Sequence, residues 1–190
     1  MKEKSHAALF ITDVQNDFIE GGALPVPHSR ELVEKINKLQ PRFRHILAVR
    51  DWHPPHHVSF ASTHGKRVGE KFLGQTLWPD HCIQNEWGSA FAEGLDTSRF
   101  EKVFDKGADP HKDSYSAFGN PELAPYLLLH HLDHLYIVGL ATDYCILATV
   151  LDARALGLKV TLLLDCCRAI DPRQEASALQ RMRDAGVDCI

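Results

Sequence analysis

One cysteine, Cys145, stands where a thiol is easy to ionise. It ends the run Gly139-Leu140-Ala141-Thr142-Asp143-Tyr144-Cys145, which follows the apolar stretch from His134 to Val138. This pattern predicts that Cys145 lies just inside the start of a helix, where unpaired backbone N–H groups and the helix dipole favour a thiolate. The same N–H groups could hold the oxygen of a tetrahedral acyl intermediate.

The helix start alone is too weak to activate this thiol. The dipole contributes roughly 0.3 to 1 kcal/mol, whereas one pKa unit corresponds to about 1.36 kcal/mol. A thiol with an ordinary pKa of about 8.5 would therefore stay mostly protonated at neutral pH. A nucleophilic Cys145 needs a base and a cation nearby.

Asp13 and Lys106 are the candidates for these two roles, because each ends an apolar, strand-like run. A carboxylate can accept the proton of the thiol and later return it to a leaving amine, and an ammonium group can keep that carboxylate ionised. The structural alternative is a buried Asp13–Lys106 ion pair beside a cysteine that only packs as a small apolar residue.

A second group of residues has the types and spacing of a metal site. Asp51 and His53 are two positions apart, so in an extended segment both side chains face the same side. With His81 they offer two imidazoles and one carboxylate, which suit Zn²⁺, Fe²⁺ or Mn²⁺ and leave positions open for water or substrate. His57 is a further candidate in the same loop. The alternative is a set of solvated loop histidines.

Several other residues indicate their roles less strongly. Three aromatic residues near the two groups could stack a flat ring, with a role in the core as the alternative: Phe18, Trp78 and Tyr115. Cys166 and Cys167 are expected to pack at a strand end, because the chain has no C-x-x-C motif. Asp143 is expected to stabilise the first turn of its helix.

The elements that must position these side chains alternate between strands and helices. Near-continuous apolar strands of this kind predict a parallel sheet covered on both faces, so the expected fold is α/β, a Rossmann-like three-layer sandwich with a mostly parallel sheet of about six strands. Because ligands bind at the carboxyl ends of such strands, the ionisable groups should meet in one crevice. The predicted strands are Ala7–Asp13, His45–Asp51, Glu101–Lys106, His134–Leu140, Lys159–Asp165 and Val187–Ile190.

Three helices have recognisable ends. Ser29 is expected to cap a helix that ends near Pro41, and Thr142 a helix that stops at Gly157. Asp171 precedes a proline and should cap the last helix. The segment from Pro54 to Gly88 is rich in His, Gly and Pro and is expected to be an irregular, functional loop.

The composition limits the class of protein. The chain has 190 residues, of which 44% are hydrophobic and 24% charged, so a single domain over residues 1–190 is expected. The net charge of -4 and the absence of a long apolar run argue against nucleic-acid and membrane partners. Five cysteines without regular spacing favour a reducing compartment, the cytoplasm.

Taken together, the motifs resemble nicotinamidases and pyrazinamidases of the isochorismatase-like cysteine hydrolase superfamily. The resemblance covers nearly the whole chain. It is carried by six segments in the order of that family: Asp13-Val14-Gln15-Asn16-Asp17-Phe18 followed by Gly21-Gly22, Asp51-Trp52-His53-Pro54, Trp78-Pro79-Asp80-His81-Cys82, Lys106-Gly107, Asp113-Ser114-Tyr115-Ser116-Ala117-Phe118, and Gly139 to Cys145.

The resemblance implies hydrolysis of nicotinamide to nicotinate and ammonia through a cysteine thioester, with pyrazinamide as a further substrate. It implies one divalent metal ion, zinc before iron or manganese, and leaves a homo-oligomer open. It also implies a cis peptide bond between Leu140 and Ala141. The implied roles are catalysis for Asp13, Lys106 and Cys145, an oxyanion hole from the amides of Ala141 and Cys145, metal ligation by Asp51, His53 and His81, with His57 as a further ligand or neighbour, and substrate binding by Phe18, Trp78 and Tyr115.

Other functions are compatible with parts of this pattern. Isochorismatase-type cleavage of a vinyl ether needs neither the thiol nor the metal residues. Relatives that cleave carbamoyl or ureido groups would share the acid, lysine and cysteine but generally lack the metal ligands. A non-catalytic α/β protein that binds a metal or a partner is the alternative from a different class.

Overall fold

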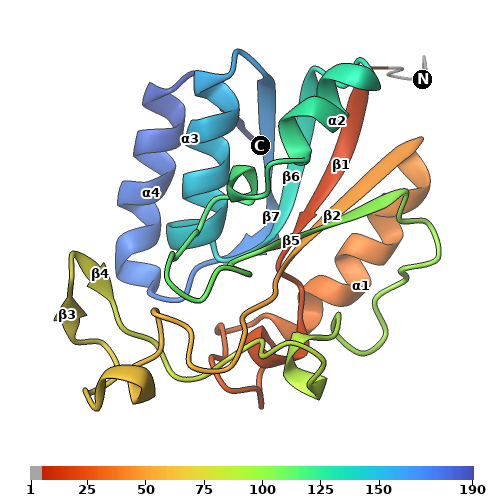
Figure 1. Ribbon diagram of the computed structural model, residues 1–190. Coiled ribbons are helices and arrows are strands. Elements are labelled where there is room, and N and C mark those ends of the chain that lie inside the picture. The colour runs from red at the N-terminus through yellow and green to blue at the C-terminus, as the bar shows by residue number, and fades with distance from the viewer. Residues whose placement is uncertain (1–5) are drawn as a thin grey trace.

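The structure is a computed structural model that describes residues 6–190. Residues 1–5, which include the short basic stretch at the N-terminus and the start of the predicted domain, lie outside the described residues. The centre is a six-stranded parallel sheet (Figure 1). In spatial order its strands are β5 (Lys102–Lys106), β2 (His45–Asp51), β1 (Ala7–Thr12), β6 (His134–Leu140), β7 (Lys159–Arg168) and β8 (Asp188–Cys189). The predicted α/β fold is confirmed.

Strand β1 is apolar on both of its faces, which is typical of a parallel sheet that is covered on both sides. All six residues of β1 are buried, and β1 pairs with β2 on one side and β6 on the other. Ala8 and Phe10 belong to one apolar cluster, whereas Leu9 and Ile11 belong to another. Because successive residues of β1 point into two different apolar clusters, helices must pack on both faces of the sheet. The result is three layers: helices, sheet and helices.

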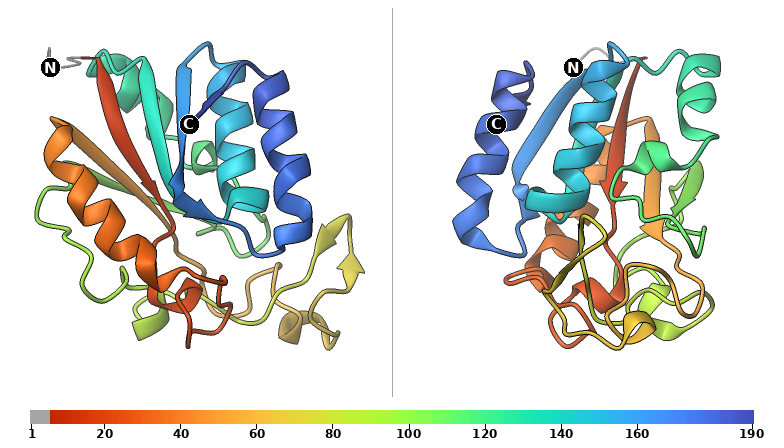
Figure 2. Two further views of the ribbon diagram at one scale, coloured as in Figure 1. Left: turned by 180° about the vertical axis from the view of Figure 1, so that it is seen from behind. Right: turned by 60° about the vertical axis from the view of Figure 1, so that its left-hand side comes forward.

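Helices pack on both faces of the sheet (Figure 2). Helix α1 (Arg30–Leu39) packs Leu32 and Ile36 into one cluster. Helices α2 (Leu123–Leu129), α3 (Leu147–Ala155) and α4 (Pro172–Asp184) contribute to the other. The sequence reading did not predict α2 as an element. Short 3₁₀ turns lie at Asn16–Phe18, Gln40–Arg42, Ser62–His64, Trp87–Ser89 and Ala117–Gly119.

Two of the predicted helix caps are wrong in their chemistry. Ser29 precedes α1 but makes no capping bond; the Glu20 carboxylate accepts the Arg30 N–H at 2.7 Å instead. Thr142 does not cap an α-helix, because Thr142–Ile146 is a π-helical turn and α3 begins only at Leu147. The predicted Asp171 cap is confirmed, since its carboxylate accepts the Arg173 N–H at 3.0 Å.

The predicted strand ends are close to those observed, with one clear difference. Strand β7 continues past Asp165 to Arg168, and its pairing with β6 shifts between Ile137 and Gly139. The segment from Pro54 to Gly88 is mostly irregular, as predicted, and contains a small hairpin of β3 (Lys71–Phe72) and β4 (Gln75–Thr76). In residues 6–190, no helix is long and apolar enough to span a membrane.

Candidate active site

Four residues that are distant in sequence meet at the carboxyl end of the sheet. Asp13 follows β1, Asp51 ends β2, Lys106 ends β5, and Cys145 lies in the π-helical turn after β6. Close approach of β6 to β1 requires Gly139, because its φ is +115° and a Cβ there would lie 2.0 Å from the Thr12 carbonyl oxygen. The four ionisable residues thus meet at the carboxyl end of the sheet, as the sequence predicted.

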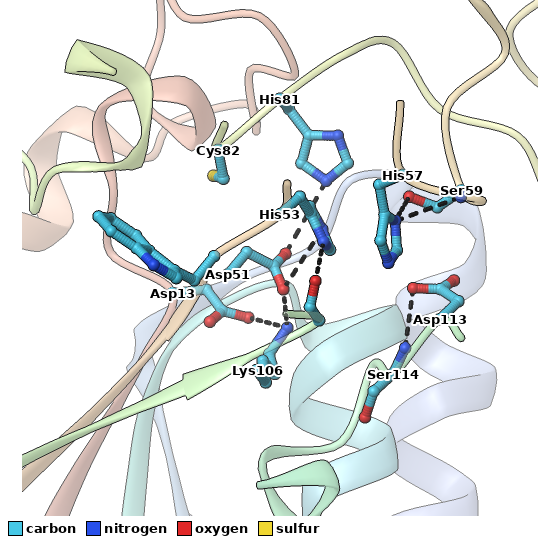
Figure 3. Close-up of polar contacts among 12 residues, drawn as sticks. Asp13, Asp51, His53, His57, Ser59, His81, Cys82, Lys106, Asp113 and Ser114 are labelled. Carbon is cyan, nitrogen blue, oxygen red and sulfur yellow. Dashed lines mark hydrogen bonds and ion pairs between the residues drawn. The ribbon is translucent and has the colours of Figure 1, made fainter. Parts of the chain in front are cut away.

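The Lys106 ammonium group is the centre of this cluster. Its Nζ lies 3.0 Å from Oδ2 of Asp13 and 2.5 Å from Oδ1 of Asp51, and it donates to Sγ of Cys145 at 3.3 Å (Figure 3 shows the two carboxylate contacts). The Lys106 side chain is 1% exposed. One buried cation thus neutralises two buried carboxylates and touches the thiol, as the first candidate group required.

Burial controls the protonation of this cluster. It raises the pKa of Asp13 to about 7, although the charge of Lys106 opposes the shift. Burial also raises the pKa of Cys145 well above its ordinary value, again against the effect of Lys106. The sequence analysis expected the helix start to favour a thiolate. In the resting site the desolvation of the thiol outweighs that effect, so Cys145 needs a base for each turnover.

The turn that carries Cys145 is held from two sides. The peptide bond between Leu140 and Ala141 is cis, as the resemblance implied. The Asp143 carboxylate accepts the N–H groups of Ile170 and Asp171 at 2.9 and 3.0 Å. Asp143 lies in the first turn of its own helical segment, as predicted. Its carboxylate in addition ties the turn that carries Cys145 to the loop before α4.

Asp51, His53 and His81 form a donor set for a cation. His53 Nε2 lies 3.7 Å from one Asp51 oxygen and His81 Nε2 lies 3.8 Å from the other, and the three donor atoms fall within 4.8 Å of one another. Each Nδ1 faces a backbone carbonyl, that of Gly107 at 2.9 Å for His53 and that of Pro79 at 2.7 Å for His81.

These contacts fit a metal ion. A carbonyl acceptor at Nδ1 fixes the tautomer that leaves Nε2 as a lone-pair donor, which is the usual outer support of a metal-bound histidine. Burial lowers the pKa of His81 to about 4, so its imidazole is neutral at physiological pH. Lys106 lowers the pKa of Asp51 far enough to overcome the effect of burial, so the carboxylate is ionised. Burial lowers the pKa of His53, but Asp51 and the Gly107 carbonyl together outweigh this effect and raise that pKa overall, so an ion that binds His53 displaces a proton. With that proton lost, two neutral imidazoles and one carboxylate are ligands that a divalent transition metal prefers.

His57 is a neighbour of this set and lies outside it. Its ring stacks on that of His53, with centroids 4.1 Å apart. Both of its nitrogens face other groups, since Nδ1 lies 2.7 Å from Ser59 Oγ and Nε2 lies 3.3 Å from the Lys112 carbonyl oxygen. Of the two possibilities that the resemblance left open, the geometry therefore favours a neighbour over a ligand.

A narrow cavity of about 30 Å³ connects Cys145 with the donor set. Its wall contains the predicted aromatic residues, and the Trp78 indole N–H donates to the Tyr115 hydroxyl at 2.9 Å. The wall also contains residues that the sequence analysis missed: Leu24, Ser59, Asp113, Ser114, Tyr144 and Ile170. Tyr144 and Asp113 lie inside motifs that carried the resemblance and could have been found there, whereas Leu24 and Ile170 give no signal in the sequence.

A further missed residue, Gln15, holds the backbone of Asp51. Its side-chain amide donates to the Asp51 carbonyl at 2.8 Å and accepts the Asp51 N–H at 2.8 Å. A third bond, 2.9 Å long, goes to the Ser89 carbonyl. Gln15 is fully buried, so these bonds satisfy its amide and fix the position of Asp51.

Two named relatives are similar to this chain over nearly its whole length. A nicotinamidase of Escherichia coli is 43% identical over 195 residues, which cover 94% of this chain and 92% of that protein. A nicotinamidase of Acinetobacter baylyi is 38% identical over 202 residues, which cover 100% of this chain and 94% of that protein.

Solved structures share the fold. A nicotinamidase/pyrazinamidase of Acinetobacter baumanii superposes with a TM-score of 0.95 at 37% identity, covering 100% of this chain and 97% of that one. A pyrazinamidase of Pyrococcus horikoshii in complex with zinc gives 0.85 at 37% identity, with 97% and 98% covered. Yeast nicotinamidase bound to the inhibitor nicotinaldehyde gives 0.89 at 33% identity, with 97% and 99% covered.

The match to a family agrees with the site geometry. Residues 7–190 match the isochorismatase domain, so the match includes every strand of the sheet and all the residues that meet at its carboxyl end. This chain therefore belongs to the isochorismatase family.

Proposed function

We propose that this chain hydrolyses nicotinamide to nicotinate and ammonia. The observation that carries the proposal is the buried Lys106 ammonium group, which contacts Asp13, Asp51 and Cys145 and so joins an acid–thiol pair to a metal donor set in one aromatic-walled cavity. The similarity to proteins named nicotinamidases, over more than nine-tenths of the chain, supports the same substrate.

In the first half of the reaction Asp13 takes the proton of Cys145. The raised pKa of Asp13, about 7, suits a base that must take up and release a proton near neutral pH. Lys106, 3.3 Å from Sγ, stabilises the thiolate as it attacks the carboxamide carbon. The backbone N–H groups of Ala141 and Cys145, two residues of the cavity wall, bind the oxygen of the tetrahedral intermediate.

In the second half the intermediate collapses to a thioester. Asp13 gives its proton to the departing amine, which leaves as ammonia. A water molecule then loses a proton to Asp13 and attacks the thioester carbon. The bond to sulfur breaks, nicotinic acid leaves and ionises to nicotinate in solution, and Asp13 returns the proton to the Cys145 thiolate. Every proton that moves within the site passes through Asp13, and Lys106 remains protonated throughout.

Asp51, His53 and His81 would hold a divalent ion, which we take to be zinc, with iron and manganese as the alternatives. Bound there, the ion would coordinate the pyridine nitrogen and so orient the ring. The zinc complex of the similar pyrazinamidase supports this assignment. Phe18, Trp78 and Tyr115 would pack against the ring, and the Trp78–Tyr115 hydrogen bond keeps two of these side chains in place. Pyrazinamide, which differs by one ring nitrogen, should also be hydrolysed.

The remaining sequence-based predictions concern the whole molecule. The single domain over residues 1–190 and the homo-oligomer stay predictions. So does the cytoplasmic location, which is supported by five cysteines that are all free.

An ammonia assay tests the proposed function. Purified protein should release ammonia from nicotinamide, and a chelator should reduce the rate until the metal found by elemental analysis is restored. Cys145→Ala should lower turnover by at least about 10³-fold. The matched control is Cys166→Ala, which removes another buried thiol on β7 and should keep the wild-type rate. Wild-type ammonia release by Cys145→Ala would contradict the mechanism.

A further inference from the structure

Two polar residues of the cavity wall have no role in the reaction steps above. Ser59 is 1% exposed, and both Ser59 and Asp113 line the cavity together with the donor set. One Asp113 oxygen accepts the Ser114 N–H at 2.9 Å. The other oxygen, Oδ2, is buried, and among residues 6–190 no group donates a hydrogen bond to it. In Figure 3 both residues lie to the right of His53, and the His57 ring stands beside Ser59.

A buried carboxylate oxygen without a donor is unfavourable, because it has lost its hydration and gained nothing in return. Such atoms are rare in folded proteins and call for a specific reason. Two donors of the cavity wall, the Trp78 indole N–H and the Ser114 hydroxyl, are already bonded to other groups. The donor that Asp113 requires must therefore come from what occupies the cavity.

Ser59 offers an acceptor to the same cavity. The Lys112 carbonyl can only accept, so His57 Nε2 carries the hydrogen of that 3.3 Å contact. The Ser59 N–H donates to His57 Nδ1 at 3.3 Å, so this nitrogen accepts. The Ser59 hydroxyl lies 2.7 Å from the same Nδ1 and must donate its only hydrogen there. Its oxygen then has lone pairs left and no hydrogen to give.

Two acceptors therefore share a cavity with three metal donors. Asp113 is not in the group whose donor atoms lie within 4.8 Å of one another, so it does not complete that group directly. Three protein ligands leave a divalent ion with open positions, which water fills. Water bound to a cation is a strong hydrogen-bond donor, because the ion draws charge from its oxygen.

We propose that Asp113 and Ser59 accept hydrogen bonds from water bound to the metal at Asp51, His53 and His81. This inference rests on the metal centre of the proposed function and adds to it two positioning residues. They act on the metal through its water, by fixing where the open positions point. His57 belongs to the same arrangement, because it accepts the Ser59 hydrogen and so keeps the Ser59 oxygen an acceptor.

Metal binding without substrate tests the proposal. Metal-free wild-type protein, Asp113→Asn and Ser59→Ala are titrated with Zn²⁺ against a competing chelating indicator, and the Co²⁺ forms are compared by their visible absorption. Loss of an outer hydrogen bond of this kind should weaken Zn²⁺ binding by about 10- to 100-fold. The Co²⁺ bands of both variants should shift, because the number or position of bound waters changes.

The control variant is Asp109→Asn, which changes an exposed aspartate in the same segment. It should bind Zn²⁺ as the wild type does. Urea unfolding of the metal-free proteins separates positioning from a structural role. Asp113→Asn should be as stable as the wild type or more stable, because it removes a buried charge that lacks a donor.

Three outcomes overturn the inference. The first is Zn²⁺ binding within twofold of the wild type together with unchanged Co²⁺ bands. The second is a metal-free Asp113→Asn protein that is destabilised while its Zn²⁺ binding is unchanged. The third is wild-type protein that binds neither metal, which also removes the metal from the proposed function. Failure of wild-type protein to release ammonia from nicotinamide would instead contradict the proposed function, and the metal titration is independent of it.

Discussion

The ammonium nitrogen of Lys106 lies 2.5 Å from Oδ1 of Asp51, and this buried ion pair joins the Cys145 thiol to the candidate metal donor set. The same nitrogen contacts Asp13 and Cys145. A substitution at Asp51 should therefore change the electrostatic environment of the Cys145 thiol through Lys106, which contacts both. Since Lys106 is the cation common to both carboxylates, its removal should affect folding as well as chemistry.

Lys106→Met should destabilise the metal-free protein by about 3–5 kcal/mol, because it leaves two carboxylates buried without a cation. Urea unfolding measures the free-energy change. Lys102→Met is the matched control on the same strand, since Lys102 pairs with Glu122 at 3.0 Å on the surface. The control should cost less than about 1 kcal/mol. Equal losses in the two variants would show that the ion pair at the site has no special importance.

The acid limb of the pH profile should lie near neutrality. The mechanism needs Asp13 ionised, and burial raises its pKa to about 7. As the pH falls through this value Asp13 binds a proton and can no longer accept one from Cys145, so kcat/KM should fall. The measurement is kcat/KM from pH 5 to 9, with the metal content of the enzyme checked at each pH. A rate that stays constant down to pH 5 at constant metal content would exclude Asp13 as the base.

His81→Ala should weaken Zn²⁺ binding by more than about 100-fold. Loss of a residue that only hydrogen-bonds to a metal ligand already weakens binding by about 10- to 100-fold, and His81 is assigned as a ligand itself. The KM for nicotinamide should rise, since the ring loses its anchor. Metal analysis after dialysis and steady-state kinetics measure both effects. His64→Ala is the control, because His64 lies in the same loop and its ring nitrogen faces the Val58 carbonyl. Full metal content in His81→Ala would contradict the assigned donor set.

Gly107→Ala should disturb the metal site through His53. Gly107 has a φ of +66°, and a Cβ there would lie 2.3 Å from Cε1 of His53. Gly65→Ala is a close control, since its φ is +59° and nothing lies within 4 Å of the added Cβ. Both variants bear the cost of the left-handed backbone, but Gly107→Ala should lose about 1–3 kcal/mol more through the clash. It alone should weaken Zn²⁺ binding, by about tenfold or more. Equal effects of the two substitutions would contradict this account.

Much of the fold could be predicted from local patterns. The bounds of β2 and β6 match the prediction, because these strands are short apolar runs limited by polar residues. Helix α2 was missed because its sequence, LAPYLLL, contains a proline and has no clear polar face. The π-helical turn at Thr142 was also missed. Its backbone N–H groups at Tyr144 and Ile146 share the Ala141 carbonyl, and such geometry depends on how β6 and α4 hold the turn.

The candidate site was predictable where residue type sets the chemistry. Asp13, Lys106, Cys145 and the three metal donors were named from their types, spacing and resemblance, and the structure brings all of them together. Gln15 and Asp113 were not assigned roles, although both stand in quoted motifs. Their importance comes from partners that are distant in the chain: Gln15 holds Asp51, and Asp113 faces a cavity formed by several loops.

The sequence by itself determined the α/β class and the reacting groups available, because hydrophobic periodicity and side-chain chemistry are local properties. The tertiary structure decided which of these groups are protonated and which of them are in contact. Burial, which no single segment produces, keeps the Cys145 thiol protonated and moves the pKa of Asp13 toward neutrality. The position of Lys106 against Asp13, Asp51 and Cys145 likewise depends on the order β5-β2-β1-β6. This order places the carboxyl ends of the four strands along one edge of the sheet, where the long Lys106 side chain reaches past β2 to the groups that follow β1 and β6.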